Sequence, residues 1–394
     1  MEKVSAYIHI PFCVKRCNYC DFNTYAGKED LIPAYISALC KEIDRVSLNF
    51  SEGIEIYTVY FGGGTPSLIS PNFLHKVLMS LKSNFSFIEK VEMTVEVNPG
   101  TISLNYLQQI NGIGITRLSI GMQSANQAEL DLLGRQHDYV SVVKTVGLAR
   151  KAGIANINLD LIFGIPNQTE KTWKKSLKKA ISLKPDHLSL YALTIEDSTP
   201  LAEKIAEGMI SMPDDDLEAE MYEWAEKILK QSGFKQYEIS NWARRDQYID
   251  YRCQHNLQYW RNLPYLGFGA GAHSYFNHMR WENKKQILSY INAINGEDER
   301  ICTIHPAVNI YSELSSTMEM GETMMMGLRL VREGVNLLDF RNRFGKSVFD
   351  VYENEVRRLE QVGLLQIDDD RKRICLTRRG KHLGNQVFMS FLGD

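Results

Sequence analysis

Three cysteines near the start of the chain are the residues with the clearest chemical potential. Cys13, Cys17 and Cys20 are spaced C-x3-C-x2-C and follow an alternating segment at residues 4–10 that predicts a β-strand. Thiolates are the ligands that iron–sulfur clusters take, and a four-iron cluster offers four metal corners. The spacing therefore predicts a cluster bound by three thiolates, with one iron left open for a substrate or cofactor.

Zinc and disulfides are the alternatives for these cysteines. Zinc usually takes four protein ligands in structural sites, and only His9 lies near enough in the sequence to complete a set. Disulfides need paired cysteines and an oxidising compartment, whereas three of the 7 cysteines crowd into this one motif. We expect the other four to be ordinary buried residues: Cys40, Cys253, Cys302 and Cys375.

The composition is that of a globular protein with more than one domain. A chain of 394 residues exceeds what one hydrophobic core usually organises. The formal net charge of -3 gives no general attraction to nucleic acid or anionic membrane. The first residues enter a strand without an apolar leader, and no stretch of about twenty apolar residues follows. We therefore expect a cytoplasmic protein, whose reducing surroundings suit free thiols.

Strands and helices alternate through the first half of the chain. Strands are predicted at residues 4–10, 55–61, 91–97, 115–122, 154–163 and 187–194. Helices are predicted between them at residues 31–48, 71–85, 104–110, 139–152 and 170–183. This alternation predicts a parallel sheet with helical crossovers, either a barrel or a doubly wound sheet. No G-x-G-x-x-G follows the first strand, which argues against a dinucleotide-binding fold.

Polar residues gather where these strands end. The run G-G-G-T-P begins at Gly62 after the second strand, and later strands carry Glu96, Asn98, Gln123, Ser124, Asn158 and Asp160. A β/α barrel places its active site at this edge. A carboxylate in a covered strand is costly without a partner, so Glu96 and Asp160 need a ligand, a helix to cap or a pairing with Arg117. The glycine run suits either close backbone approach to a polar ligand or a tight turn.

Residues 197–314 break the alternating pattern. A helix at 215–231 and a strand at 236–240 are predicted there. The following run, residues 252–261, combines an imidazole, an amide and two aromatic rings, provided by His255, Asn256, Tyr259 and Trp260. This composition suits a flat aromatic ligand or haem iron, and the alternative is a packed surface turn. A glycine-rich apolar segment at 266–275 suits close backbone approach.

Residues 315–394 read as a small separate domain. Helices are predicted at 318–330, 337–344 and 348–362, strands at 364–367 and 373–376 around a turn at 368–371, and a last helix from Thr377. This order resembles a winged helix. The 13 basic and 12 acidic residues of 317–394 nearly cancel, which is too balanced for a phosphate-tracking surface. We expect a packing or lid domain that binds no nucleic acid, with the five methionines of its first helix in the core.

Taken together, these motifs resemble radical S-adenosylmethionine (SAM) proteins of the oxygen-independent coproporphyrinogen III oxidase group, and within it the haem-chaperone branch. The resemblance covers nearly the whole chain. It is carried by Y-x-H-I-P-F-C-x3-C-x2-C from Tyr7, by G-G-G-T-P from Gly62 and by D-L-I-F-G-I-P from Asp160. It implies an α/β fold: an open (β/α)6 partial barrel at 1–196, an α+β extension at 197–314 and a winged-helix-like domain at 315–394.

The resemblance also implies cofactors. Cys13, Cys17 and Cys20 would bind a [4Fe–4S] cluster, whose open iron the amino and carboxylate groups of SAM would chelate. The positions that match SAM-binding residues are Tyr7, Tyr19, Gly63, Gly64, Thr65, Glu96, Gln123, Arg135, Asp160 and Ala192. A carboxylate such as Asp160 can hold ribose hydroxyls, and Arg135 can pair with the SAM carboxylate. In the family's enzymes an electron donor reduces the cluster, and SAM is cleaved to a 5′-deoxyadenosyl radical.

Two departures separate the chain from the oxidases it resembles. Those oxidases usually continue to a further cysteine, C-x3-C-x2-C-x-C, but Asp21 and Phe22 follow Cys20 here. They also carry an N-terminal extension before the cysteine strand. Conversely, residues 255–260 match the H-N-x-x-Y-W motif that the chaperone branch links to haem.

We therefore expect a haem chaperone that binds haem and delivers it to an acceptor protein. This expectation leaves room for peripheral contact with a membrane-bound acceptor. Two alternatives remain open: oxidative decarboxylation of coproporphyrinogen III, and another SAM-radical reaction such as methylation or cyclisation of a small molecule.

Overall fold

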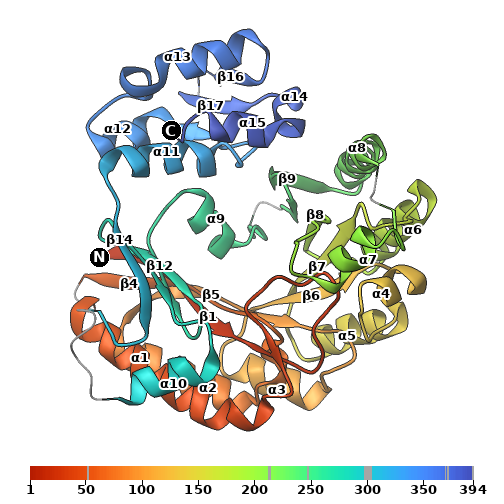
Figure 1. Cartoon of the computed structure of the whole chain (residues 1–394), viewed down its shortest axis with the longest axis vertical. Coiled ribbons are helices and arrows are strands. Elements are labelled where there is room, and N and C mark those ends of the chain that lie inside the picture. The colour runs from red at the N-terminus through yellow and green to blue at the C-terminus, as the bar shows by residue number, and fades with distance from the viewer. Residues whose placement is uncertain are drawn as a thin grey trace.

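The computed structural model describes residues 1–50, 53–211, 214–245, 248–296, 304–368, 370 and 372–392. A curved sheet with helices along its outer side forms the lower part of the molecule in Figure 1, and a mostly helical domain built by the C-terminal residues lies above it. Helix α9 (Gln254–Trp260) lies between these two parts (Figure 1).

Six parallel strands form the centre of the sheet and follow one another in chain order. They are β1 (Glu2–Ile10), β4 (Ile54–Gly63), β5 (Ser86–Val97), β6 (Arg117–Gln123), β7 (Asn156–Phe163) and β8 (His187–Ala192). The crossover helices are α1 (Ile32–Phe50), α2 (Pro71–Asn84), α3 (Leu104–Gly112), α5 (Tyr139–Lys151) and α6 (Glu170–Ser182). All these strands and helices were predicted. A doubly wound sheet reverses its strand order at one point; this one does not, so the alternation belongs to an open (β/α)6 barrel.

Alternation along each strand gives the sheet one apolar and one polar face. In β6, Leu118, Ile120 and Met122 are fully buried in the main hydrophobic core, whereas Ser119 and Gln123 line the interior of the barrel. The crossover helices cover the apolar face. The polar face therefore lines the concave side, where a site can form.

The segment predicted as an α+β extension adds strands to both edges of this sheet, which has twelve strands among the described residues. On the β1 edge lie β11 (Tyr265–Phe268), β12 (His273–Phe276), β13 (Met279–Asn283) and β14 (Val308–Glu313). On the β8 edge lie β10 (Asn241–Arg244) and β9 (Phe234–Glu238). Because β10 and β11 lie at opposite edges, the chain between them must cross the open side of the barrel, and α9 forms in that crossing.

Several short elements complete this part of the chain. They are β2 (Phe12–Cys13), β3 (Tyr25–Ala26), the 3-10 helices at Glu29–Leu31 and Pro66–Leu68, α4 (Gln127–Leu132), α7 (Pro200–Ala206), α8 (Asp215–Gln231) and α10 (Ile287–Asn295). Of these, α8 matches the predicted helix, and α4 and α7 were not predicted. No helix in the described ranges is long and apolar enough to cross a membrane.

The C-terminal residues have a hydrophobic core of their own. Their elements are α11 (Ser316–Gly327), β15 (Val335–Asn336), α12 (Leu337–Phe344), α13 (Val348–Gln361), β16 (Leu365–Asp368), β17 (Arg373–Leu376), α14 (Arg378–His382) and α15 (Gly384–Met389). The predicted helices and the β-ribbon are present, although Asp369 and Arg371 of its turn lie outside the described residues. Met320 and Met324 are buried as expected, but Met318 is 52% exposed, because it lies on the outer side of the first turn of α11.

The cysteines outside the motif are packing residues where the structure describes them. Cys40, Cys253 and Cys375 are buried and free of disulfides, as predicted, and Cys302 lies outside the described residues. Burial raises the pKa of Cys253 to about 12, so its thiol stays protonated at neutral pH.

Candidate functional site

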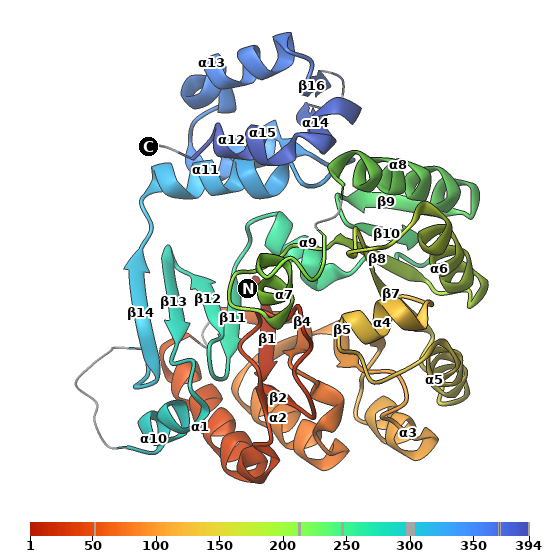
Figure 2. The same ribbon diagram turned by 45° about the vertical axis from the view of Figure 1, so that its right-hand side comes forward.

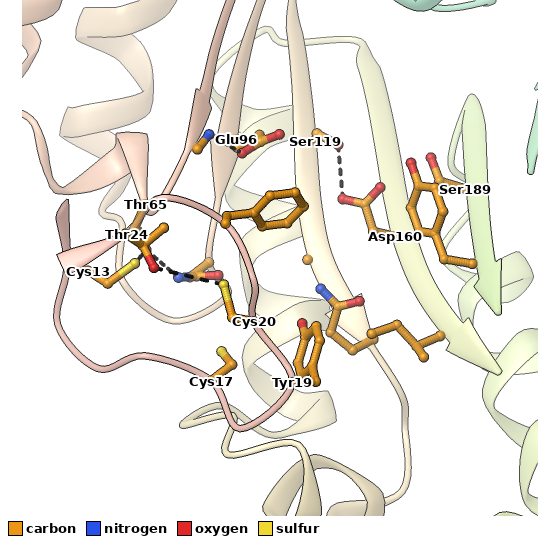
Figure 3. Close-up of a pocket in the computed structure, with 18 of the residues that line it drawn as sticks. Cys13, Cys17, Tyr19, Cys20, Thr24, Thr65, Glu96, Ser119, Asp160 and Ser189 are labelled. Carbon is orange, nitrogen blue, oxygen red and sulfur yellow. Dashed lines mark hydrogen bonds between the residues drawn. The ribbon is translucent and has the colours of Figure 1, made fainter. Parts of the chain in front are cut away.

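The three cysteines of the motif line a cavity of about 480 Å³ at the carboxyl ends of the barrel strands (Figure 3). Cys13 ends the short strand β2, and Cys17 and Cys20 lie on the loop that follows it. Asn18 anchors this loop: its backbone N–H donates to Leu133 O at 3.0 Å and its side-chain amide donates to Leu132 O at 2.8 Å. The loop is therefore held against the end of α4.

Each thiol has a polar neighbour that can donate a hydrogen bond to sulfur. The Thr65 hydroxyl donates to Cys13 Sγ at 3.7 Å, and Arg135 Nη1 donates to Cys17 Sγ at 3.5 Å. The Thr24 hydroxyl lies 3.9 Å from Cys20 Sγ (Figure 3). Donors of this kind stabilise thiolates and tune the potential of a bound cluster.

The thiols suit a cluster better than a single ion. In the described part of the chain, no three His, Cys, Asp or Glu side chains are grouped closely enough to share one metal ion. His9, the candidate fourth zinc ligand, is engaged elsewhere, with Nδ1 3.0 Å from the Tyr7 hydroxyl and Nε2 2.9 Å from Asn23 O. In a cluster each thiolate binds a different iron, so wider spacing is required.

The glycine run forms a tight turn whose backbone N–H groups already donate hydrogen bonds within the protein. Gly63 N donates to Glu96 Oε2 at 3.1 Å, Gly64 N to Ile10 O at 2.8 Å and Thr65 N to Phe12 O at 2.8 Å. Gly63 has a φ of 114°, and a Cβ on Gly64 would lie 2.6 Å from Phe12 O and 3.0 Å from Cys13 Sγ. The run therefore brings the backbone against the cysteine motif, and its N–H groups are not free to bind a ligand.

Glu96 and Asp160 face the cavity and find partners within the barrel. Glu96 Oε1 accepts from the Tyr60 hydroxyl at 2.8 Å. Asp160 accepts a hydrogen bond from the Ser119 hydroxyl at 3.0 Å (Figure 3) and another from the Asn158 amide at 2.7 Å. Burial raises the pKa of both carboxyl groups, that of Glu96 to about 7. In the part of the chain that the structure describes, neither forms an ion pair with Arg117 or caps a helix.

Two polar side chains converge on the backbone of Gly121. Arg135 Nη2 donates to Gly121 O at 3.0 Å and to Asn98 Oδ1 at 2.6 Å, while Arg135 Nε is buried without a hydrogen-bond partner. Gln123 has a φ of 58°, an uncommon backbone conformation for a residue other than glycine. A Cβ on Gly121 would lie 2.9 Å from Gln123 Nε2 and 3.0 Å from Arg135 Nη2. A side chain at position 121 would therefore displace the ends of these two flexible side chains.

Helix α9 forms one wall of this cavity, but the histidine of its motif, His255, is buried. Asn256 lines the cavity, whereas His255 is 2% exposed. Both ring nitrogens of His255 have partners: Nδ1 lies 2.7 Å from the Thr58 hydroxyl and Nε2 lies 3.1 Å from the Tyr259 hydroxyl. Burial lowers the pKa of His255 to about 3, so the imidazole is neutral at physiological pH.

The two aromatic residues of the run belong to the packing around α9. The Tyr259 ring packs edge-on against His255 and Tyr265, at centroid distances of 4.9 and 4.6 Å. The Trp260 ring lies 4.6 Å from the Arg329 guanidinium of the C-terminal domain, and its Nε1 is buried without a hydrogen-bond partner.

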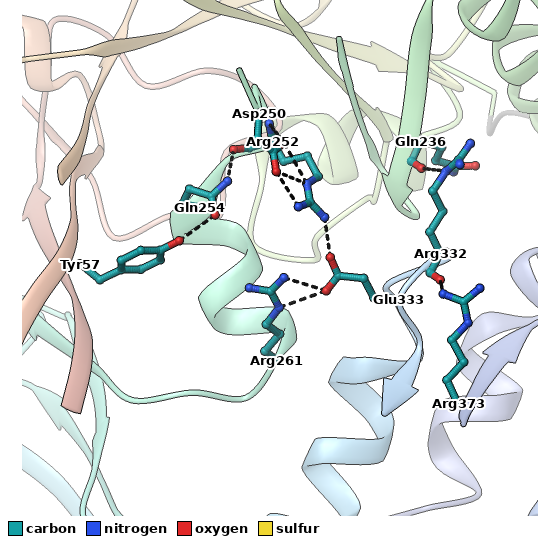
Figure 4. Close-up of polar contacts among 9 residues, drawn as sticks. All are labelled: Tyr57, Gln236, Asp250, Arg252, Gln254, Arg261, Arg332, Glu333 and Arg373. Carbon is teal, nitrogen blue, oxygen red and sulfur yellow. Dashed lines mark hydrogen bonds and ion pairs between the residues drawn. The ribbon is translucent and has the colours of Figure 1, made fainter. Parts of the chain in front are cut away.

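Long-range contacts fix both ends of α9. Glu92, a half-buried residue of β5, accepts hydrogen bonds from the backbone N–H groups of Gln254 at 2.9 Å and His255 at 3.2 Å. Glu333, in the C-terminal domain, pairs with Arg252 just before the helix and with Arg261 Nη2 just after it, the latter at 2.8 Å (Figure 4). The helix is thus attached to both the barrel and the C-terminal domain.

Comparison with known proteins shows the family to which the chain belongs. The radical SAM superfamily matches residues 7–180, and the HemN C-terminal domain matches residues 314–383. The heme chaperone HemW of Lactococcus lactis is 35% identical over 99% of this chain and 97% of its own length. The heme chaperone HemW of Bacillus subtilis is 34% identical, with 99% of each chain covered. The chain belongs to the HemW family of radical SAM proteins.

The fold of this HemW family member also matches a solved structure. Coproporphyrinogen III oxidase (HemN) from Escherichia coli, a radical SAM enzyme, superposes with a TM-score of 0.82 over 99% of this chain and 90% of its own, at 24% identity. The shared fold confirms the predicted radical SAM barrel with its C-terminal domain.

The structure places most of the residues that were predicted to bind SAM around one cavity. Nine of the ten positions matched to SAM line the cavity: Tyr19, Gly63, Gly64, Thr65, Glu96, Gln123, Arg135, Asp160 and Ala192. Tyr7 lies behind the wall instead, with its ring centroid 6.3 Å from those of Tyr60 and His255.

Other lining residues were not singled out from the sequence. Tyr60, Ser119, Ser189 and Tyr191 also line the cavity. Ser119 lies on the same face of β6 as Gln123, and the period of two along that strand is the signal that could have found it.

Proposed function

We propose that this protein binds haem and delivers it to an acceptor protein, and that its barrel holds a [4Fe–4S] cluster together with SAM. The position of α9 carries the proposal: the helix with the H-N-x-x-Y-W motif forms part of the wall of the same cavity that the three cysteines line. Full-length similarity to heme chaperones of the HemW family supports it.

The cysteine motif would hold the cluster, and the polar interior of the barrel would hold SAM. Cys13, Cys17 and Cys20 supply three soft thiolates. When bound, a reduced cluster can pass an electron to SAM. Arg135 lines the cavity, its buried Nε has no hydrogen-bond partner, and its guanidinium can pair with the SAM carboxylate. The Asp160 carboxylate can accept hydrogen bonds from the ribose hydroxyls of SAM.

The predicted SAM contacts of Tyr7, Tyr19 and the other matched positions remain part of this proposal. Tyr19 would lie against SAM directly because it lines the cavity. Tyr7 would act from behind the wall, through His9 and Tyr60.

We assign the haem contacts to His255, Asn256, Tyr259 and Trp260. A neutral imidazole is the form that binds iron, and His255 is neutral because its burial lowers its pKa. Iron at His255 Nε2 must replace the Tyr259 hydroxyl. Haem binding at α9 is therefore coupled to a movement of Tyr259 or of the helix.

Anaerobic cluster reconstitution followed by haem titration tests the proposal. We expect a Soret band for bound haem in the wild-type protein and a weakened or shifted band in His255→Ala. The absence of haem binding by the wild-type protein would contradict the chaperone function. An identical titration of His255→Ala would contradict the iron assignment. Formation of protoporphyrinogen IX from coproporphyrinogen III would instead favour the oxidase.

A further inference from the structure

Strand β4 has two faces with different contacts. Val59 and Phe61 are fully buried in the main hydrophobic core. Thr58 and Tyr60 alternate with them and point to the opposite side, toward α9 and the barrel cavity, because successive side chains of a strand lie on opposite faces. Helix α9 packs against this strand (Figure 2). One strand therefore carries contacts to the helix and contacts to the cavity.

Thr58 and Tyr60 hold His255 in its buried position. The Thr58 hydroxyl lies 2.7 Å from His255 Nδ1. The Tyr60 ring packs against the imidazole, with a centroid distance of 5.0 Å and an interplanar angle of 31°. The Tyr7 ring packs beside them, with its centroid 6.3 Å from those of both rings. A displacement of the His255 ring would therefore require Tyr60 to move or to lose this contact.

The hydroxyl of Tyr60 contacts the proposed SAM site. It donates to Glu96 Oε1 at 2.8 Å, and Glu96 Oε2 accepts from Gly63 N at 3.1 Å. The packing between Tyr60 and Glu96 is tight: a Cβ on Gly62 would lie 2.9 Å from Tyr60 Cε1 and 3.2 Å from Glu96 Oε1. Tyr60 therefore contacts a proposed SAM-binding residue through its hydroxyl and the proposed iron ligand through its ring.

These contacts make the two sites depend on the position of one side chain. The sulfonium charge of SAM favours the ionised form of a neighbouring carboxyl group such as Glu96. An ionised carboxylate accepts a stronger hydrogen bond than a neutral carboxyl group, so bound SAM would strengthen the hydrogen bond from the Tyr60 hydroxyl. Tyr60 would then stay packed on His255. Iron binding, which requires the surroundings of His255 to rearrange, would become less favourable.

We propose that Tyr60 couples the two sites, so that SAM bound in the barrel weakens haem binding at α9 and haem weakens SAM binding. Such coupling is reciprocal, because both ligands shift the equilibrium between the same two arrangements of the protein. Tyr60 is a positioning residue for iron, since its effect passes through His255. Binding of SAM would favour release of haem to the acceptor. The inference rests on the function proposed above, because it requires both ligands.

Haem titration of the full-length, cluster-reconstituted protein with and without saturating SAM tests the coupling. In the wild-type protein we expect SAM to weaken haem affinity by about tenfold, the difference between a neutral and a charge-assisted hydrogen bond. Haem should weaken SAM affinity by the same factor in calorimetry. In Tyr60→Phe, which keeps the ring but loses the bond to Glu96, both ligands should bind without affecting each other. Glu96→Gln, whose side chain cannot change charge, should also remove the mutual effect.

Tyr57→Phe is the matched control. The Tyr57 hydroxyl, also on β4, donates to Gln254 Oε1 of α9 at 2.8 Å (Figure 4), and no hydrogen bond joins it to Glu96 in the described part of the chain. The mutual effect should persist in this variant. If SAM weakens haem binding equally in Tyr60→Phe, the ligands compete directly and the role of Tyr60 is wrong.

Two further outcomes separate this inference from the proposed function. If the wild-type protein binds haem with the same or higher affinity when SAM is present, the coupling is wrong while the proposed function stands. If the wild-type protein binds no haem at all, the proposed function is wrong and the coupling is wrong with it.

Discussion

The cysteine loop and helix α9 differ in how ready they are to receive a ligand. The loop presents Cys13, Cys17 and Cys20 to a cavity, each beside a single weak donor. Helix α9 instead holds His255 with both ring nitrogens engaged and almost no exposed surface. The comparison teaches that the proposed cluster site is preformed, whereas the proposed binding of iron by His255 would require a rearrangement.

The largest expected effect comes from breaking the preformed site. Cys17→Ser replaces a soft thiolate with a hydroxyl, which is a poor ligand for iron in a cluster. We expect complete loss of the iron-dependent absorbance after anaerobic reconstitution. Cys40→Ser, a substitution outside the motif, should retain it. Four iron atoms per chain in Cys17→Ser would show that the ligand assignment is wrong.

The position of α9 against the barrel should depend on the hydrogen bonds that its first backbone N–H groups donate to Glu92. Glu92→Ala leaves the backbone N–H groups of Gln254 and His255 buried without their acceptor, at about 1–3 kcal/mol for each group. We expect the free energy of unfolding to fall by about 3 kcal/mol in chemical denaturation. Glu89→Ala, at an exposed position of the same strand, should change it by less than about 0.5 kcal/mol. An equal loss of unfolding free energy in the two variants would show that Glu92 does not stabilise α9.

Tyr259 tests the rearrangement itself. Tyr259→Phe keeps the ring but removes the hydroxyl that occupies His255 Nε2. Because haem then has no hydrogen bond to displace, its affinity should rise by up to about tenfold, as one neutral hydrogen bond allows. Tyr265→Phe, whose ring also packs on Tyr259, is the control and should leave affinity unchanged. Weaker haem binding in Tyr259→Phe would mean that the hydroxyl helps hold haem.

The smallest effect concerns pH in the preformed cavity. Burial raises the pKa of Glu96 to about 7, so this carboxyl group is mainly ionised at pH 8 and mainly protonated at pH 6. SAM carries a positive charge on its sulfonium group, and ionised Glu96 favours the binding of that charge. Calorimetry should therefore show SAM affinity falling several-fold from pH 8 to pH 6. The fall should disappear in Glu96→Gln; a fall of the same size there would assign it to another group.

The barrel could be predicted from the sequence because its signals are local. Strands show a period of two, and helices begin at residues that cap their own first turn: Ser70, Ser103, Asp138 and Thr169. The polar residues at the carboxyl ends of the strands could be located because the strands themselves were predicted. Their convergence on one cavity was predictable because parallel strands end at a common edge.

Helix α9 could not be predicted because its signals are long-range. Its N-cap residue, Cys253, makes no side-chain capping bond, and the acceptor for its first N–H groups is Glu92 on a distant strand. The sequence motif therefore suggested a ligand or a turn, but not a helix. The partners of His255 were equally hidden, since Thr58 precedes it by 197 positions.

Glu333 gives the two ends of α9 a common point of attachment outside the barrel. Its carboxylate pairs with Arg252 before the helix and with Arg261 after it (Figure 4). A movement of the C-terminal domain would therefore be transmitted to both ends of α9. A protein that docks on this domain and tilts it would pull both ends of α9 at once, and the force would reach His255 without any contact between the docked protein and haem.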